Sequence, residues 1–112
     1  MKRYCLALDL KEDEELIRQY EKYHEKVWPE ILASIGDAGI EEMEIYRIGT
    51  RLFMIIETNE SFSFEKKKQA DLSNSRVVEW EQLMSNYQQA LPQAKPGEKW
   101  LLMKNVFQWR KK

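Results

Sequence analysis

The sequence predicts a single α+β domain in which strands and helices follow one another in the order β-α-β-β-α-β. Three observations carry this prediction: apolar alternation at the N-terminus, two separate stretches with helical apolar spacing, and two apolar runs joined by a short glycine turn. The chain has 112 residues, of which 43% are hydrophobic, so it fits one domain with its own core. No internal repeat or linker divides it, and residues 1–112 are interpreted as one unit.

The first strand and the first helix are predicted from the spacing of apolar side chains. Every second position near the N-terminus is apolar, as in a strand: Tyr4, Leu6, Leu8 and Leu10. The acidic residues 12–15 then favour a helix N-terminus, because peptide dipoles stabilise negative charge there. The following apolar residues recur at steps of three and four, typical of one helix stripe: Leu16, Tyr20, Tyr23, Val27, Ile31 and Ile35.

Pro29 interrupts this helical pattern. Proline lacks a backbone donor and clashes with the preceding turn, so we expect a kink or a restart with Pro29 at the first position of a second segment. Gly36 and Gly39 mark the end of the helical region.

A hairpin is predicted in the middle of the chain. Residues 40–48 and 51–58 have strand-like composition, and only Gly49-Thr50 separates them. Residues 52–56 are apolar at every position, so this strand is expected to be central and covered on both faces.

The second half of the chain predicts two helices and a last strand. Residues 63–72 suit a short helix, and residues 73–75 offer caps for another. The apolar stripe of that second helix is Val77, Trp80, Met84 and Tyr87. Leu91-Pro92 ends it, residues 95–97 form a turn, and residues 100–109 read as the final strand.

This order of elements is that of the ferredoxin-like split motif. Two helical layers cover one face of such a sheet, and the other face also needs cover. A second copy of the same sheet would supply it, so we expect an isologous homodimer that forms a dimeric α/β barrel.

Composition excludes several classes of partner. The 18 basic and 19 acidic residues leave a net charge of −1, which gives no reason to expect nucleic acid or a membrane surface as a partner. No apolar run approaches the roughly 20 residues that span a bilayer, and we see no signal peptide. The single cysteine, Cys5, has no internal disulfide partner, so a cytoplasmic location is expected.

His24 is the one histidine of the chain and the strongest candidate for chemistry. Tyr20 lies four residues before it and Trp28 four residues after it, a spacing that stacks side chains along one side of a helix. By itself this pattern is more often structural than catalytic. No second histidine and no cysteine pair accompany it, so we expect no metal site.

The segment around His24 resembles the signature of the L-rhamnose mutarotase family. In residues 20–31, Tyr20 and His24 stand at the family's spacing and Trp28-Pro29-Glu30 follows. Residues 79–84 are similar to the family's tryptophan-containing helix, and residues 103–107 to its closing strand, so the resemblance covers nearly the whole chain.

The resemblance implies a ferredoxin-like dimer that interconverts the α and β anomers of a 6-deoxy-L-hexose without a cofactor. It implies that His24 is the catalytic acid/base and that Tyr20 and Trp80 hold the sugar. Two substrate-binding positions depart from rhamnose-specific members, because Glu81 replaces an aromatic residue and Met43 replaces a tyrosine. Other segments look more like the members associated with L-fucose, which we therefore expect as the preferred sugar.

Mutarotation needs one proton removed from the anomeric hydroxyl and one delivered to the ring oxygen. A histidine suits one transfer, because the unperturbed pKa of its side chain, about 6.5, leaves both forms populated near neutral pH. The candidates for the second transfer, which the sequence leaves open, are Tyr20, Tyr46, Glu57 and Glu81. Tyr46 is also expected on the wall of the sugar pocket.

Two other functions remain as alternatives. The first is a small cofactor-independent monooxygenase on the same kind of dimeric barrel, and the second is a non-catalytic sugar-binding dimer. The Trp28-Pro29-Glu30 signature favours the mutarotase over the former, and retention of His24 favours it over the latter.

Overall fold

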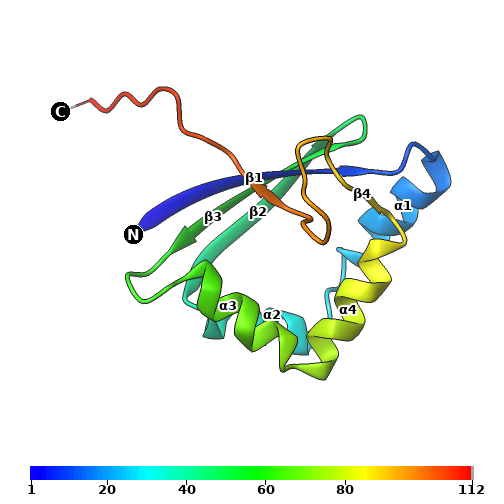
Figure 1. Cartoon of the computed structure of the whole chain (residues 1–112), viewed down its shortest axis with the longest axis horizontal. Helices are drawn as coiled ribbons and strands as arrows, with labels where there is room; N and C mark the ends of the chain where they lie inside the picture. The colour runs from blue at the N-terminus through cyan, green and yellow to red at the C-terminus, as the bar shows by residue number, and fades with distance from the viewer. Residues whose placement is uncertain (112) are drawn as a thin grey trace.

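Residues 1–111 form one antiparallel sheet and four helices, and the helices lie on one side of the sheet (Figure 1). The structure is a computed structural model that describes residues 1–111. The elements in chain order are β1 (Lys2–Leu10), α1 (Glu14–Tyr23), α2 (Pro29–Asp37), β2 (Ile40–Ile48), β3 (Arg51–Thr58), α3 (Phe64–Leu72), α4 (Ser75–Ser85), β4 (Gln88–Gln89) and β5 (Leu101–Leu102). The predicted ferredoxin-like α+β fold is confirmed.

The sheet has the order β2-β3-β1-β4, with β5 also pairing with β1. β3 is therefore central, as predicted from its apolar composition. It pairs with β1 from Lys2↔Thr58 to Asp9↔Arg51. The predicted hairpin joins β2 to β3, where Gly49 takes a positive φ of 56°, a conformation that glycine adopts without a steric penalty. β2 is left at the edge of the sheet.

Local capping explains where the helices begin. Asp13 accepts hydrogen bonds from the backbone N–H groups of Glu15 and Leu16, and Asn74 caps α4 in the same way. The predicted restart at Pro29 is confirmed, since Pro29 is the first residue of α2. The expectation that Trp28 continues the helix of Tyr20 and His24 is wrong, because α1 ends at Tyr23 and Trp28 caps α2.

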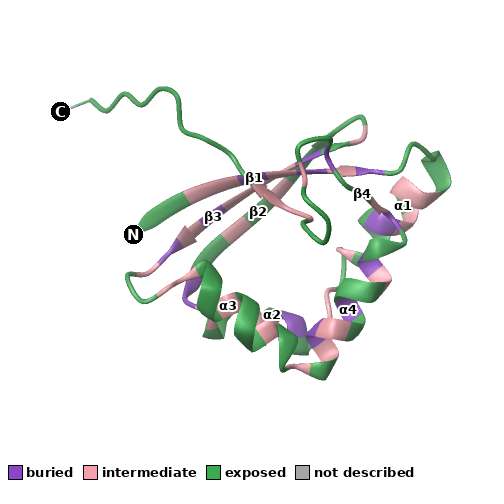
Figure 2. Ribbon diagram, viewed as in Figure 1, coloured by how far each residue is buried: buried purple, intermediate pink, exposed green. Residues whose placement is uncertain are grey.

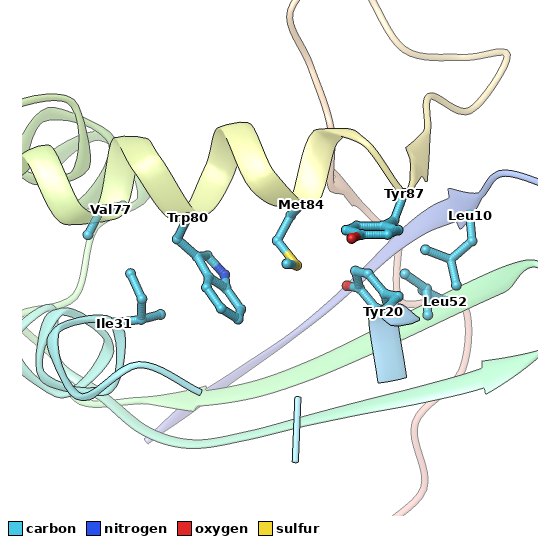
Figure 3. Close-up of a cluster of buried hydrophobic side chains, with 8 residues drawn as sticks. All are labelled: Leu10, Tyr20, Ile31, Leu52, Val77, Trp80, Met84 and Tyr87. Atoms are coloured by element: carbon cyan, nitrogen blue, oxygen red, sulfur yellow. The ribbon is translucent and has the colours of Figure 1, made fainter. Parts of the chain in front are cut away.

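The core fills the space between the helices and one face of the sheet (Figure 2). Its larger cluster joins α1, α2, α4 and the sheet (Figure 3), and comprises Leu10, Tyr20, Ile31, Leu52, Val77, Trp80, Met84 and Tyr87. A smaller cluster of Leu6, Ile40 and Ile56 lies further along the sheet.

None of the described helices lies on the opposite face of the sheet. Leu52 and Ile56 are buried under the helices, and Phe53 and Ile55, which alternate with them along β3, point the other way and are half-buried. β3 was predicted to be covered on both faces, and within this chain the helices cover one of them.

The predicted last strand over residues 100–109 is wrong for most of its length. Only Leu101–Leu102 pairs with β1, and the backbone N–H of Met103 makes one further hydrogen bond to Cys5. Beyond Met103 the chain leaves the sheet and its apolar side chains are exposed. Apolar composition alone cannot form a strand where the chain offers no strand to pair with.

Candidate functional site

A pocket of about 410 Å³ lies between the C-terminal end of α1 and the strands β2 and β3. Its walls are formed by Tyr20, Glu21, His24, Glu25, Ile45, Tyr46, Arg47 and Leu52. Small-molecule sites are typically concave and largely apolar, with a few polar groups that orient the ligand. The pocket meets that description and contains the one histidine of the chain.

The end of α1 positions the imidazole of His24. His24 caps this helix at its C-terminus, and its Nδ1 lies 2.8 Å from the main-chain carbonyl oxygen of Tyr20. A carbonyl oxygen only accepts hydrogen bonds, so Nδ1 carries the proton and donates it. In the neutral imidazole, Nε2 is then left as the unprotonated nitrogen, which can act as a base.

Aromatic rings support His24 from the side of α4. The Trp80 ring meets the imidazole edge-on, with 5.7 Å between centroids, and the Trp28 ring packs on Trp80 at 5.1 Å. The guanidinium of Arg76 lies 4.1 Å from the centroid of a Trp28 ring. Trp80 is therefore a buried support behind the histidine and is outside the set of residues that line the pocket.

Tyr20 is buried and its phenol stays protonated. The pKa of Tyr20 is raised to about 12: burial is the largest cause, the hydrogen bond with the Gln88 side chain partly offsets it, and the charge of Glu81 adds to it. A neutral phenol donates hydrogen bonds throughout the physiological range. Its ring also packs against His24 at 4.4 Å between centroids.

Arg47 and the glutamates Glu21 and Glu25 belong to the pocket, and the sequence analysis missed them. Arg47 Nε donates to Glu21 Oε2 at 2.7 Å and Nη1 donates to the carbonyl oxygen of Gly49 at 2.7 Å. Two signals could have found them: Glu21 and Glu25 flank His24, and Arg47 shares a strand face with Ile45.

The remaining predicted site residues are more scattered. Tyr46 borders the pocket, but its hydroxyl donates to Glu44 at 2.5 Å, which raises the pKa of Tyr46. Met43 packs against the smaller core cluster. Glu81 is exposed and its carboxylate lies 3.3 Å from Lys99 Nζ.

Glu57, a candidate for the second proton transfer, lies far from this arrangement. It alternates with the helix-facing residues Ile56 and Thr58, and accepts a hydrogen bond of 2.9 Å from Arg3. The Glu57 carboxylate, through this hydrogen bond and its charge, raises the pKa of Arg3. Of the four candidates, Tyr20 and Tyr46 line the pocket with His24.

Residues 1–111 offer neither a cluster of metal-ligating side chains nor a helix suited to spanning a membrane. These residues contain no group of three or more His, Cys, Asp or Glu side chains that could hold a metal ion. None of the described helices has the length and hydropathy needed to cross a membrane.

Sequence comparison places the chain among sugar mutarotases. The profile of the L-rhamnose mutarotase family matches residues 3–109. The L-fucose mutarotase of Xanthomonas campestris pv. campestris is 44% identical over 109 residues, which cover 96% of this chain and 87% of that protein. The L-rhamnose mutarotase of Bacteroides thetaiotaomicron is 31% identical over 101 residues, covering 86% of this chain and 88% of that protein.

Comparison with solved structures supports the fold. The L-rhamnose mutarotase of Formosa agariphila superposes with a TM-score of 0.72 at 20% identity, covering 98% of this chain and all of that one. A dimeric ferredoxin-like protein from an uncultured marine organism has a TM-score of 0.63 at 16% identity, covering 97% and 98% of the two chains.

Proposed function

Because the chain belongs to the L-rhamnose mutarotase family, we propose that it interconverts the α and β anomers of a 6-deoxy-L-hexose in the pocket around His24. The single observation that carries the role of His24 is the bond from its Nδ1 to the Tyr20 carbonyl, which leaves Nε2 free to act as a base. The other pocket walls offer an apolar surface from Ile45 and Leu52 and polar groups for sugar hydroxyls.

The proposed reaction moves two protons and breaks one bond. Nε2 of His24 takes the proton of the anomeric hydroxyl, the C1–ring oxygen bond breaks, and the ring oxygen receives a proton. Tyr20 is the proposed source of the second proton, directly or through a water molecule, because it lines the same pocket and its phenol is protonated at physiological pH. After rotation about the C1–C2 bond, the reverse transfers close the ring on the other face.

L-Fucose is the proposed preferred sugar. The support is the higher identity to the L-fucose mutarotase, 44% against 31% for the L-rhamnose mutarotase of Bacteroides. Met43 and Glu81, the two departures from the rhamnose pattern, do not line the pocket. The proposed preference for L-fucose therefore depends on sequence identity to the relatives and not on a contact of these two side chains with the sugar.

Saturation-transfer NMR on L-fucose and L-rhamnose tests this function. Irradiation of one anomer should diminish the signal of the other when protein is added, with faster exchange for L-fucose, and oxygen should not be consumed. Sugar line broadening without exchange would indicate a binding module, and oxygen uptake with an aromatic substrate would indicate a monooxygenase. Exchange of L-rhamnose at the same or a higher rate would overturn the sugar preference alone.

The proposed active form is a homodimer built through the open face of the sheet. The support is the pair of half-buried side chains Phe53 and Ile55 on a face that none of the described helices covers, together with the dimeric neighbour of the same fold. Sedimentation velocity at micromolar concentration should give twice the chain mass of 13.5 kDa, and a stable monomer would contradict the proposal.

A further inference from the structure

A second cavity, of about 490 Å³, borders the end of α1 on the side away from the pocket around His24. The region of α1 contributes Tyr20, Glu21, His24 and Glu25 to the first pocket, whereas it contributes Gln19, Lys22, Tyr23 and Lys26 to the second cavity, which Trp28 completes. Successive residues of a helix turn by about 100°, so these two sets of positions project to different sides of α1. The two cavities share no lining residue and are separate sites.

The charged groups that line the second cavity are all basic. Lys22 and Lys26 both border it, and neither forms an ion pair with a residue that the structure describes. Gln19 adds a side-chain amide, and Glu15, to which that amide donates, is itself paired with Arg18. Two ammonium groups without a counter-ion at one cavity attract an anion.

Helix stability explains only one of these two lysines. Lys22 lies in the last turn of α1, where the unpaired carbonyl groups favour a cation. Lys26 lies beyond the end of α1 at Tyr23, in the turn that leads to α2, and the field of the helix falls off within its last turn. The helix therefore gives no reason for Lys26 to join Lys22 at the same cavity, and an anionic ligand does.

Two aromatic rings form the rest of the wall. Tyr23 is 37% exposed and Trp28 is half-buried, so each can present part of its ring to the cavity. Both rings are held in place by Trp80, with 6.3 Å between the centroids of Tyr23 and Trp80 and 5.1 Å between those of Trp28 and Trp80. Fixed aromatic rings that carry a polar group suit a ligand with both C–H faces and hydroxyl groups, as a sugar has.

We propose that this second cavity binds a phosphorylated sugar, with its phosphate at Lys22 and Lys26 and its ring against Tyr23 and Trp28. The two parts of the wall select this class of ligand together. Inorganic phosphate gains nothing from the aromatic rings, and a neutral sugar gains nothing from the charges of the lysines. The site goes beyond the proposed anomer exchange and does not depend on it.

An NMR titration with three probes tests the site. The ¹⁵N-labelled full chain is titrated with α-D-glucose 1-phosphate, with inorganic phosphate and with D-glucose, and the signals of residues 19–28 are followed. Glucose 1-phosphate should shift them saturably and bind about fivefold more tightly than inorganic phosphate, and more tightly than glucose, because only it meets both walls. Absence of a saturable shift at these residues would overturn the site. Equal affinities for glucose 1-phosphate and inorganic phosphate would overturn the assignment of a sugar ring to Tyr23 and Trp28.

Variants matched in charge locate the phosphate. Lys22→Gln combined with Lys26→Gln should weaken the binding of glucose 1-phosphate about tenfold, because hydrogen bonds to charged groups are the strong ones. Lys66→Gln combined with Lys68→Gln removes the same charge from exposed positions of α3 and should leave the affinity unchanged.

Arg47→Met, which removes a cation from the first pocket, should also leave the affinity for glucose 1-phosphate unchanged. Weaker binding in Arg47→Met would place the anion in the first pocket and overturn the proposal. An equal loss in the α3 variant and in the Lys22 and Lys26 variant would show attraction by net charge alone and overturn it as well. If the wild type exchanges no anomers, the proposed function fails, and these titrations still decide whether the second site exists.

Discussion

The imidazole Nδ1 of His24 lies 2.8 Å from the main-chain carbonyl oxygen of Tyr20, one helical turn earlier. Because the acceptor belongs to the backbone, this tautomer is set by the end of α1 and needs no second side chain. The unprotonated Nε2 is therefore available in every neutral molecule. In the proposed mechanism, this arrangement lets a histidine act as a base without a carboxylate partner among the described residues.

Replacement of His24 by alanine should lower the catalysed anomer exchange by about 10²–10⁴-fold, the usual contribution of a positioned acid/base group. The measurement is the NMR exchange rate, with circular dichroism to show that the variant is folded. A folded variant within a few-fold of the wild-type rate would show that His24 is structural.

The buried phenol of Tyr20 predicts a loss of stability at alkaline pH. Its pKa rises from 10.0 to about 12 on folding, so the stabilisation is complete below pH 10 and is lost as pH rises toward 12. Two pKa units correspond to about 3 kcal/mol. Urea unfolding of the wild type and Tyr20→Phe at pH 8 and at pH 11 measures the part of this stabilisation, about half, that is lost by pH 11.

As the pH rises from 8 to 11, the free energy of unfolding of the wild type should fall relative to that of Tyr20→Phe. A difference that is the same at both pH values would contradict the assigned pKa. At neutral pH, Tyr20→Phe should also lower anomer exchange, because it removes the proposed second proton donor. The loss should be smaller than for His24→Ala, because water can supply that proton and the ring that packs on His24 remains.

Arg47 is expected to contribute to sugar binding. The bonds from Nε and Nη1 to Glu21 and Gly49 hold the guanidinium at the pocket wall and leave other N–H groups to meet sugar hydroxyls. Arg47→Met should raise KM about tenfold, as expected for a charged hydrogen bond at a partly exposed site. Arg51→Met is the matched control, because Arg51 pairs with Asp9 away from the pocket and its loss should leave KM unchanged.

Met84 tests the packing of the core that supports the site. It is 2% exposed within the larger cluster, so Met84→Ala should lower the free energy of unfolding by about 2–5 kcal/mol. Leu32→Ala is the control, because Leu32 is 56% exposed on α2 and its truncation should cost about 0.5 kcal/mol or less. Similar losses at both positions, measured by urea unfolding, would contradict the core assignment.

Local patterns in the sequence were sufficient for most of the fold. Strand alternation, helical stripes and the capping residues Asn74 and Pro29 act within a few positions of one another, so the elements they predict agree with the structure. The pairing of Tyr20 with His24 also follows from spacing alone, because positions four apart on a helix lie on the same side.

The tertiary structure decided what depends on contacts between distant segments. It placed Arg47 of β2 beside Glu21 of α1. It also placed Glu81 and Glu57 outside the pocket, which the spacing of residues along the sequence could not reveal. It also showed that residues 103–109 form no strand with the part of the chain that the structure describes. A strand needs a neighbour as well as a suitable composition, and that neighbour is set by the packing of the whole sheet and of any second copy beside it.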